Sequence, residues 1–357
     1  MTTDPPAGLR TRLSRPLPAF IGAALVIPLV LMLAAVIVQV VLLSRLPDRV
    51  AVHWSVDGRP DGWLPGWTSP LLTAVVVLIV SGLLAVPALP ALRDGDRGPS
   101  YRLLAALSAG LAAFTVVPAT GALWYQTGDR GVAGDQVPIE GLLLAATLAA
   151  VAVGAAAWWI QPEQQRPPEN SLPVPAHALA PGERPVWLRT ATAGRGMVAV
   201  TVGVFAVMLV STCYLWLSDA GTGTVVGGAV LTVLITVAAT VTLAFRVRVD
   251  EDGVQVASLA GRPRFTVPID DVEQVRLIQV SPNADFGGYG IRLRPGVTGI
   301  IVRRGPALEV LRRSGRRFVV TVDDAVGAAA LLTALAERRP DDDPGADPHG
   351  SGLRPPG

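Results

Sequence analysis

Three side chains that could bind a metal ion or a peptide ligand lie close together in the sequence, at His53, Asp57 and Asp61. Imidazole nitrogens and carboxylate oxygens are common metal ligands and hydrogen-bond acceptors. The pairs Asp57-Gly58 and Asp61-Gly62 are typical of tight turns. The turns favour a simpler interpretation, a compact loop in which His53 is hydrogen-bonded to a nearby carboxylate. A ligand site at the same residues remains an open alternative.

The rest of the sequence offers few residues for catalysis. The only other histidines are His177 and His349, the only cysteine is Cys213, and lysine is absent. Without lysine there is no Walker A phosphate site and no Schiff-base chemistry, and one cysteine does not build a thiolate metal cluster. The sequence therefore predicts a protein that is not an enzyme and has no cofactor. The small net charge of +2 predicts no nucleic-acid partner.

A second candidate site is a group of arginines towards the C-terminus, interrupted only by the acidic residue Glu309. Beside an anionic membrane surface each arginine would contribute about 1 kcal/mol of attraction. The group therefore predicts a face that binds lipid or a protein partner, with a merely solvated face as the alternative. Its members are Arg303, Arg304, Arg312, Arg313, Arg316 and Arg317.

Long charge-free runs must position these residues. Half of the 357 residues are hydrophobic and 16% are charged, against about 25% charged in a typical soluble domain. Each run is long enough to form about 30 Å of helix, the thickness of the hydrocarbon core. The fold class predicted is a mainly α-helical polytopic membrane protein with about six transmembrane helices, the first an uncleaved anchor. The runs are residues 20–43, 70–89, 103–124, 141–160, 197–217 and 225–245.

Arginines beside the runs predict the orientation, because positive residues are retained on the cytoplasmic side. With the N-terminus inside, ten arginines of the connecting segments lie inside and four lie outside. An even number of spans then places the C-terminus inside as well. The predicted location is the plasma membrane, with both termini cytoplasmic and residues 44–69 forming the first outer loop.

The order of these segments predicts a domain organisation. Seven prolines between residues 161 and 190 are typical of an extended linker. Ala106 with Gly110, and Ala150 with Gly154, are small-residue pairs that would let helices approach closely, although such pairs also occur by chance in a chain this rich in alanine. The predicted parts are a cytoplasmic tail (1–19), a four-helix module (20–160), a proline-rich cytoplasmic linker (161–196), a two-helix module (197–245), a cytoplasmic β-rich domain (246–338) and a disordered tail (339–357).

Alternating apolar and polar residues predict the strands of the β-rich domain. Asp323 or Asp324 is expected to cap a final helix over residues 325–337. The glycine-rich stretch 286–290 falls between strands, which predicts a hairpin loop rather than a phosphate site. This pattern resembles the bacterial pleckstrin-homology-like (PH-like) domain, a small β-barrel or sandwich with a C-terminal helix. The predicted strands are 244–249, 254–259, 264–267, 272–280, 290–293, 299–303, 307–311 and 317–322.

The first outer loop also resembles a known family, through a proline, a His-aromatic pair, two Asp-Gly turns and a tryptophan. The family is domain of unknown function 1648, which also forms the N-terminal module of SdpI-type membrane proteins that confer toxin immunity and take part in signalling. The resemblance implies characteristic positions and no agreed chemistry, and the β-rich domain departs from the SdpI-type layout. The positions are Pro47, His53, Trp54, Asp57, Gly58, Asp61, Gly62 and Trp63.

All six runs lack aspartate, glutamate, arginine and histidine, which disfavours an ion-coupled transporter. The predicted function is that of a non-enzymatic integral membrane protein, in envelope sensing, signalling, toxin immunity or scaffolding, acting through the outer loop and the cytoplasmic domain. A transporter or channel for an unknown solute is the alternative. The expected partners are the lipid bilayer and another membrane protein or an extracellular peptide or protein.

Overall fold

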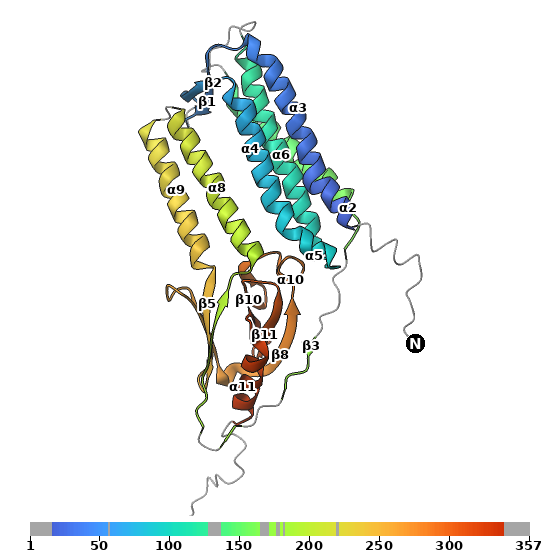
Figure 1. The fold of residues 1–357 in the computed structure, drawn as a ribbon, viewed down its shortest axis with the longest axis vertical. Coiled ribbons are helices and arrows are strands. Elements are labelled where there is room, and N and C mark those ends of the chain that lie inside the picture. Colours follow the sequence, from blue (N-terminus) through green and yellow to red (C-terminus); the bar gives the residue numbers. More distant parts are fainter. Residues whose placement is uncertain are drawn as a thin grey trace, which may run out of the picture.

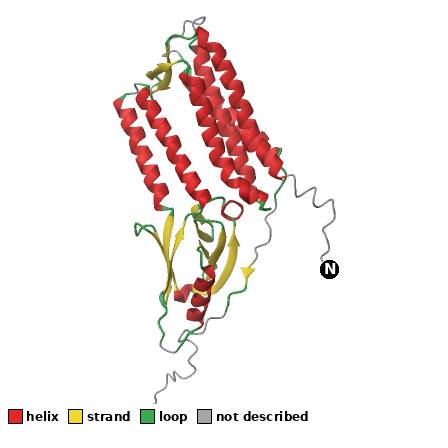
Figure 2. Cartoon of the chain, in the orientation of Figure 1, coloured by secondary structure: helices red, strands yellow, loops and turns green. Residues whose placement is uncertain are grey.

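In a computed structural model, the chain forms a bundle of long helices with a two-sheet domain at one end (Figure 1). A small β-hairpin lies at the opposite end of the bundle (Figure 2). The structure describes residues 16–55, 58–127, 137–164, 171–175, 179–180, 183–218 and 221–338. The predicted N-terminal and C-terminal tails lie almost wholly outside the described residues.

Six helical segments of the described chain are long and apolar enough to cross a membrane, and they indicate a multi-pass membrane protein. The first combines α2 (Pro16–Ile21), a π-helical turn (Gly22–Val26), α3 (Ile27–Leu42) and a 3-10 turn (Leu43–Arg45). The second combines α4 (Thr68–Ala85), a 3-10 turn (Val86–Ala88) and α5 (Leu89–Arg93). The others are α6 (Pro99–Tyr125), α7 (Ile139–Trp159), α8 (Arg195–Leu217) and α9 (Thr222–Val241).

The predicted end of the sixth span is wrong by four residues. Helix α9 ends at Val241, and Phe245 lies in strand β5 (Ala244–Asp250) with its side chain fully buried. From Phe245 onwards apolar residues alternate with Arg246 and Arg248, the period of a strand with one buried face. The length of a charge-free run does not show where the helix ends, because the first residues of β5 are also uncharged.

The predicted small-residue pairs lie where α6 and α7 meet. A Cβ atom added at Gly110 would lie 2.9 Å from the carbonyl oxygen of Ala150. A Cβ atom added at Gly154 would lie 3.1 Å from the carbonyl oxygen of Ala106. The two backbones therefore approach too closely for larger residues, and van der Waals packing holds the helices together.

The C-terminal domain is built from two sheets and one helix. The four-stranded sheet has the order β4-β5-β6-β7, and the six-stranded sheet has the order β3-β8-β11-β12-β10-β9. Apolar residues of both sheets and of α11 (Ala325–Glu337) share one core. In the described part of the chain neither sheet closes on itself. The remaining strands are β6 (Gly253–Ser258), β7 (Arg264–Pro268), β8 (Val272–Val280), β9 (Gly290–Arg294), β10 (Val297–Ile301), β11 (Gly305–Arg312) and β12 (Arg317–Thr321).

The predicted strands of this domain and its final helix are confirmed to within a few residues. The side chain of Asp324 caps α11 by accepting a hydrogen bond from the backbone N–H of Gly327. Strand β12 lies between β11 and β10, pairing antiparallel with the first and parallel with the second. That order brings together strands that are not neighbours in sequence.

Segment 161–196 is more than the linker that its prolines predict. Strand β3 (Ser171–Leu172) pairs with β8, and β4 (Trp187–Thr192) pairs with β5 along its whole length. The indole N–H of Trp187 donates to the Asp324 carboxylate, 3.1 Å away. Both strands are therefore edge strands of the C-terminal domain. The α8–α9 helix pair is inserted into this domain in sequence, between β4 and β5. Edge strands tolerate nearby prolines, so proline content did not exclude them.

The glycine-rich stretch also differs from the predicted hairpin loop. Residues Pro282–Phe286 form a short helix, α10, and Gly287 ends it in the left-handed conformation at φ 73°. Ala284 of α10 belongs to the same buried cluster as Tyr101 of α6. Helix α10, which leads into the glycine-rich stretch, therefore packs on the helical bundle and is not an exposed loop.

Candidate functional site

The outer-loop residues form a β-hairpin of β1 (Arg49–Trp54) and β2 (Pro60–Pro65). His53 pairs with Gly62 across the hairpin, beside irregularities in the register. A Cβ atom added at Gly62 would lie 2.8 Å from His53 Cβ and 2.9 Å from Ser218 Oγ. A side chain at position 62 would therefore collide with the partner strand on one side and with the end of α8 on the other, so glycine is required there.

His53 and Asp61 are joined by a hydrogen bond in this hairpin. His53 Nδ1 and Asp61 Oδ1 are 2.5 Å apart, and both side chains are about one-quarter exposed. This is the simpler arrangement that the sequence favours, a histidine held by a local carboxylate. Among the described residues, no group of three or more histidine, cysteine, aspartate or glutamate side chains is arranged to hold a metal ion. Asp57 lies outside the described residues.

The other characteristic positions of the loop lie around this pair. Gly58 adopts a left-handed φ of 77° at the hairpin turn. Pro47 is exposed between the first helical segment and β1. The backbone carbonyl of Trp63 accepts a hydrogen bond from Arg49, at 2.7 Å. Trp54 lines a pocket beneath the hairpin.

One side of the hairpin is fixed to α6 through Gln126, a residue to which the sequence analysis gave no role. Its side-chain oxygen accepts from the backbone N–H of Ala51 at 2.7 Å, and its amide nitrogen donates to the Ala51 carbonyl at 3.0 Å. Gln126 is buried. A side-chain amide thus pairs with both backbone groups of Ala51, as a neighbouring strand would.

The other side of the hairpin is fixed to α8. The Tyr214 hydroxyl donates to the Val52 carbonyl at 3.1 Å, and the backbone N–H of Trp63 donates to the Ser218 carbonyl at 2.6 Å. Ser218 directly follows the last residue of α8. The hairpin therefore bridges helices from the two predicted membrane modules.

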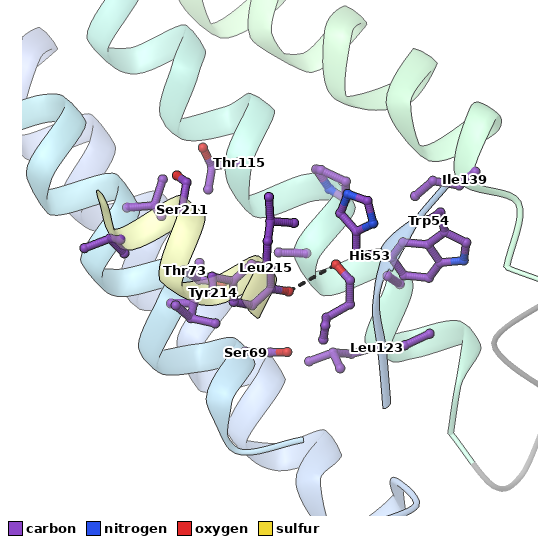
Figure 3. Close-up of a pocket in the computed structure, with 18 residues that line it drawn as sticks. His53, Trp54, Ser69, Thr73, Thr115, Leu123, Ile139, Ser211, Tyr214 and Leu215 are labelled. Carbon is purple, nitrogen blue, oxygen red and sulfur yellow. Dashed lines mark hydrogen bonds between the residues drawn. The ribbon is translucent and has the colours of Figure 1, made fainter. Parts of the chain in front are cut away.

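A pocket of about 490 Å³ lies beneath the hairpin, between these modules. Its walls come from β1, α4, α6 and α8, with Ile139 of α7 at the edge. Figure 3 shows Ser211, Tyr214 and Leu215 on the α8 side and His53 with Trp54 on the hairpin side. The walls are mostly apolar, with a few hydroxyl groups, which is typical of a small-molecule site.

Uncharged polar groups also lie inside the first spans. The Gln39 amide nitrogen donates to Thr73 Oγ1 at 3.2 Å and to Thr120 Oγ1 at 3.0 Å. These contacts join α3, α4 and α6, and Thr73 also lines the pocket. A search for ionisable residues in the spans misses Gln39, since glutamine carries no charge. The sequence signal for Gln39 was a polar side chain within a long apolar run, which is typical of a residue that bonds to another helix.

At the other end of the bundle, α8 contacts the C-terminal domain. The backbone N–H of Gly194, which precedes α8, donates to the Val302 carbonyl at 2.9 Å. A Cβ atom added at Gly196 would lie 2.5 Å from the Tyr289 hydroxyl oxygen. Burial raises the pKa of Tyr289, with Arg304 acting in the opposite direction. These groups form a close seam between α8 and the sheet domain.

The connection between α5 and α6 contacts the same domain. Arg304 forms an ion pair with Asp94 at 2.9 Å. Buried Asp96 accepts hydrogen bonds from Tyr101, at 2.7 Å, and from Ser281. Helices from both modules therefore reach from the hairpin to the C-terminal domain.

The six candidate arginines form two groups, one at each end of β11 (Gly305–Arg312). Arg303 and Arg304 precede β11, whereas the other four lie around the β11–β12 turn, at the far end of that strand. Eight residues of strand span roughly 26 Å. Four of the six are in ion pairs: Arg303 with Asp323, Arg304 with Asp94, Arg312 with Asp271 and Arg317 with Glu309. Arg313 and Arg316 are exposed.

Comparison with known families identifies the hairpin and its flanking helices. Residues 30–78 match the family described as "Domain of unknown function (DUF1648)". The match covers most of α3, the whole hairpin and the first part of α4. No curated protein and no solved structure matches the chain. The predicted resemblance of the outer loop is confirmed, and the α8–α9 pair and the C-terminal domain lie outside the matched residues.

Proposed function

We propose that this protein is a non-enzymatic transmembrane coupling protein, in which the hairpin and the C-terminal domain influence each other through α8. One observation carries the proposal: α8 is hydrogen-bonded near one end to the hairpin, through Tyr214, and at the other end to the sheet domain, through Gly194. Its 23 residues span about 34 Å as one helix. A rigid helix transmits a shift at one end to the other.

The proposed location is the plasma membrane, with the hairpin outside and both termini in the cytoplasm. In Figure 1 the described chain begins at the end of the bundle that carries the sheets, which agrees with this topology. Cysteines introduced at Ser55 and Ser314, each in a Cys213→Ala background, test the sidedness. Impermeant maleimide should label only the Ser55→Cys protein in intact cells. Labelling of the Ser314→Cys protein from outside would contradict the topology.

The C-terminal domain is proposed to be PH-like and to dock a protein partner. Two sheets sharing one core with a C-terminal helix support the assignment. Arg313 and Arg316 are exposed at the turn farthest from the bundle along β11, which suits an acidic protein partner better than the membrane surface. Envelope sensing and signalling would use such a link between the outer hairpin and a cytoplasmic partner.

A protease experiment tests the coupling. Replacing Tyr214 with phenylalanine removes the hydrogen bond to Val52 while keeping the ring. In membrane vesicles with the cytoplasmic side exposed, we expect faster cleavage of the C-terminal domain in the Tyr214→Phe protein. Thr236→Val is the control, because the Thr236 hydroxyl bonds only within α9. Equal cleavage rates in the wild type and both variants would contradict the proposal.

A cellular experiment tests the role of the hairpin. In toxin-sensitivity or envelope-stress assays that detect deletion of the protein, His53→Ala and Trp63→Ala should reproduce part of the deletion phenotype. Wild-type behaviour of both variants at normal expression would remove the hairpin from the proposed role. The pocket between the two modules also suits a transporter, and solute flux in liposomes holding only the purified protein would favour that alternative.

A further inference from the structure

The pocket beneath the hairpin has walls that belong to separate parts of the membrane domain. Its α4 and α6 walls belong to the four-helix module, and its α8 wall belongs to the helix pair. Helix α8 approaches α4 closely at Gly203, where an added Cβ would overlap the Leu83 side chain. The α8 wall of the pocket, from Val210 to Leu215, begins two turns beyond this contact. A molecule in the pocket would therefore lie between α8 and the scaffold that holds the hairpin.

The hydroxyl groups of Thr115, Ser211 and Tyr214 on the pocket walls already donate internal hydrogen bonds. Thr115 donates to the Leu111 carbonyl at 2.9 Å, Ser211 donates to the Val207 carbonyl at 2.9 Å, and Tyr214 donates to the Val52 carbonyl at 3.1 Å. Each hydroxyl oxygen retains lone pairs that accept hydrogen bonds. These three hydroxyl groups therefore present acceptors to a bound molecule.

His53 follows the same pattern. Its Nδ1 faces the Asp61 carboxylate at 2.5 Å, and in the tautomer whose proton lies on Nδ1 the ring donates to that carboxylate. The second ring nitrogen, Nε2, is then an acceptor. Figure 3 shows His53 together with the hydroxyl groups of Thr115, Ser211 and Tyr214 around the pocket.

The charge of the residues that line the pocket restricts the class of molecule that could bind there. No arginine, aspartate or glutamate is among the described residues that line the pocket. A carboxylate or phosphate group would find no arginine there and would meet the acceptor oxygens of Thr115, Ser211 and Tyr214 instead. A buried charge without a partner is costly. The pocket therefore suits an uncharged molecule with an apolar body and a hydrogen-bond donor at one end.

We infer that the pocket binds a single-chain amphiphile with a hydroxyl head group, a long-chain alcohol, whose tail lies among the apolar residues of α4, α6 and α8. The volume of about 490 Å³ lies within the range of small-molecule sites. This inference rests on the proposed function, because it supplies the ligand that would shift α8 relative to the hairpin.

Photolabelling of the full chain in lipid nanodiscs tests the inference. The probe is a long-chain alcohol that carries a diazirine in its tail, and two matched probes have the same tail. One is the methyl ether, which lacks the donor, and the other is the carboxylic acid, which is charged at neutral pH. We expect the alcohol to label α6 and α8 peptides that line the pocket, about two- to tenfold more than the ether, since one net hydrogen bond is worth about 0.5–1.5 kcal/mol.

Variants of the pocket give the second arm. Ala119→Phe places a ring in the pocket and should abolish labelling, whereas Ala152→Phe, on the exposed face of α7, should leave it unchanged. Ser211→Val removes one acceptor at an exposed position of α8 and should reduce labelling even if Ala119→Phe fails to fold. Equal labelling by alcohol and ether, labelling by the acid, or labelling that persists in both pocket variants would overturn the inference.

The outcome is separable from the test of coupling. The protease experiment on Tyr214→Phe uses no ligand, so it reports on the link between hairpin and C-terminal domain alone. A changed cleavage rate without specific alcohol labelling would overturn this inference and leave the coupling function supported. Specific labelling without a changed cleavage rate would support the site and contradict the coupling.

Discussion

The two membrane modules are held together in different ways. In the four-helix module, α6 packs on α7 through Gly110 and Gly154, and Gln39 joins three helices by hydrogen bonds. In the helix pair, Met197 is the one buried residue of α8 and Thr232 the one buried residue of α9. Apart from its packing on α9 and the approach of Gly203 to Leu83, α8 is hydrogen-bonded near its ends, to the hairpin and to the sheet domain.

This difference separates a scaffold from a moving part. A module with buried contacts along its length resists displacement, because packed interiors lose contacts when they shift. A helix tied mainly at its ends has fewer packing contacts to lose, so its motion relative to the scaffold costs less free energy. The four-helix module is therefore the fixed support, and α8 is the element that would carry a shift from hairpin to C-terminal domain.

The largest expected effect is on the packing of the scaffold. Gly110→Leu forces a side chain against the backbone of α7, and overpacking of this kind typically costs about 1–3 kcal/mol. We expect a clear fall in the thermal midpoint of the detergent-solubilised protein, followed by tryptophan fluorescence. Gly227→Leu is the control, because an added Cβ there has no neighbour within 4 Å. Equal midpoints for both variants would remove the contrast between the modules.

A smaller effect is expected from the polar network of the scaffold. Gln39→Leu removes the hydrogen bonds to Thr73 and Thr120, and single hydrogen bonds in membranes are worth about 0.6 kcal/mol on average and at most about 1.7. The midpoint should fall by less than in Gly110→Leu, in the same fluorescence measurement. The neighbouring Val40→Leu, at a lipid-exposed position, should change nothing. A fall as large in Val40→Leu would show that the network does not matter.

The smallest effect is expected at the seam with the C-terminal domain. Arg304 and Asp94 are both well exposed, at 43% and 64% of the side chain, and surface ion pairs contribute about 0–1 kcal/mol. Arg304→Gln should therefore barely change the midpoint but should raise protease sensitivity of the C-terminal domain at low salt. Added salt should make the variant and the wild type alike. A difference that persists at high salt would assign Arg304 a role beyond its charge.

The spans and most strands were predictable because each leaves a local pattern. A charge-free run of membrane length identifies α7 or α8, and alternation identifies β8, while Asp324 marks the start of α11. Strand β4 was missed because its partner, β5, follows two transmembrane helices later in the chain. The true end of α9 was missed because Phe245 is apolar in either structure.

The site was predictable only in part. The hairpin residues were found through their turn pairs and family resemblance, and the contact of His53 with Asp61 follows from their spacing. The hairpin is held in position by hydrogen bonds from Gln126 and Tyr214, which join residues 75 and 162 positions apart in the sequence. Such contacts leave no periodic signal in one sequence. The separation of the arginines into two groups was not predicted, because closeness in sequence does not reveal that the length of β11 lies between them.

The central claim is that α8 carries a displacement of the hairpin to the C-terminal domain, and two glycines of one loop test it. An added Cβ at Gly62 meets Ser218 beside the end of α8, whereas one at Gly66 meets only Leu43 and Leu46 of the scaffold. The measurement is hydrogen–deuterium exchange of residues 194–198 and 297–303 in nanodiscs. The account predicts faster exchange there in Gly62→Ala than in Gly66→Ala or the wild type. Identical exchange in Gly62→Ala and Gly66→Ala would contradict it.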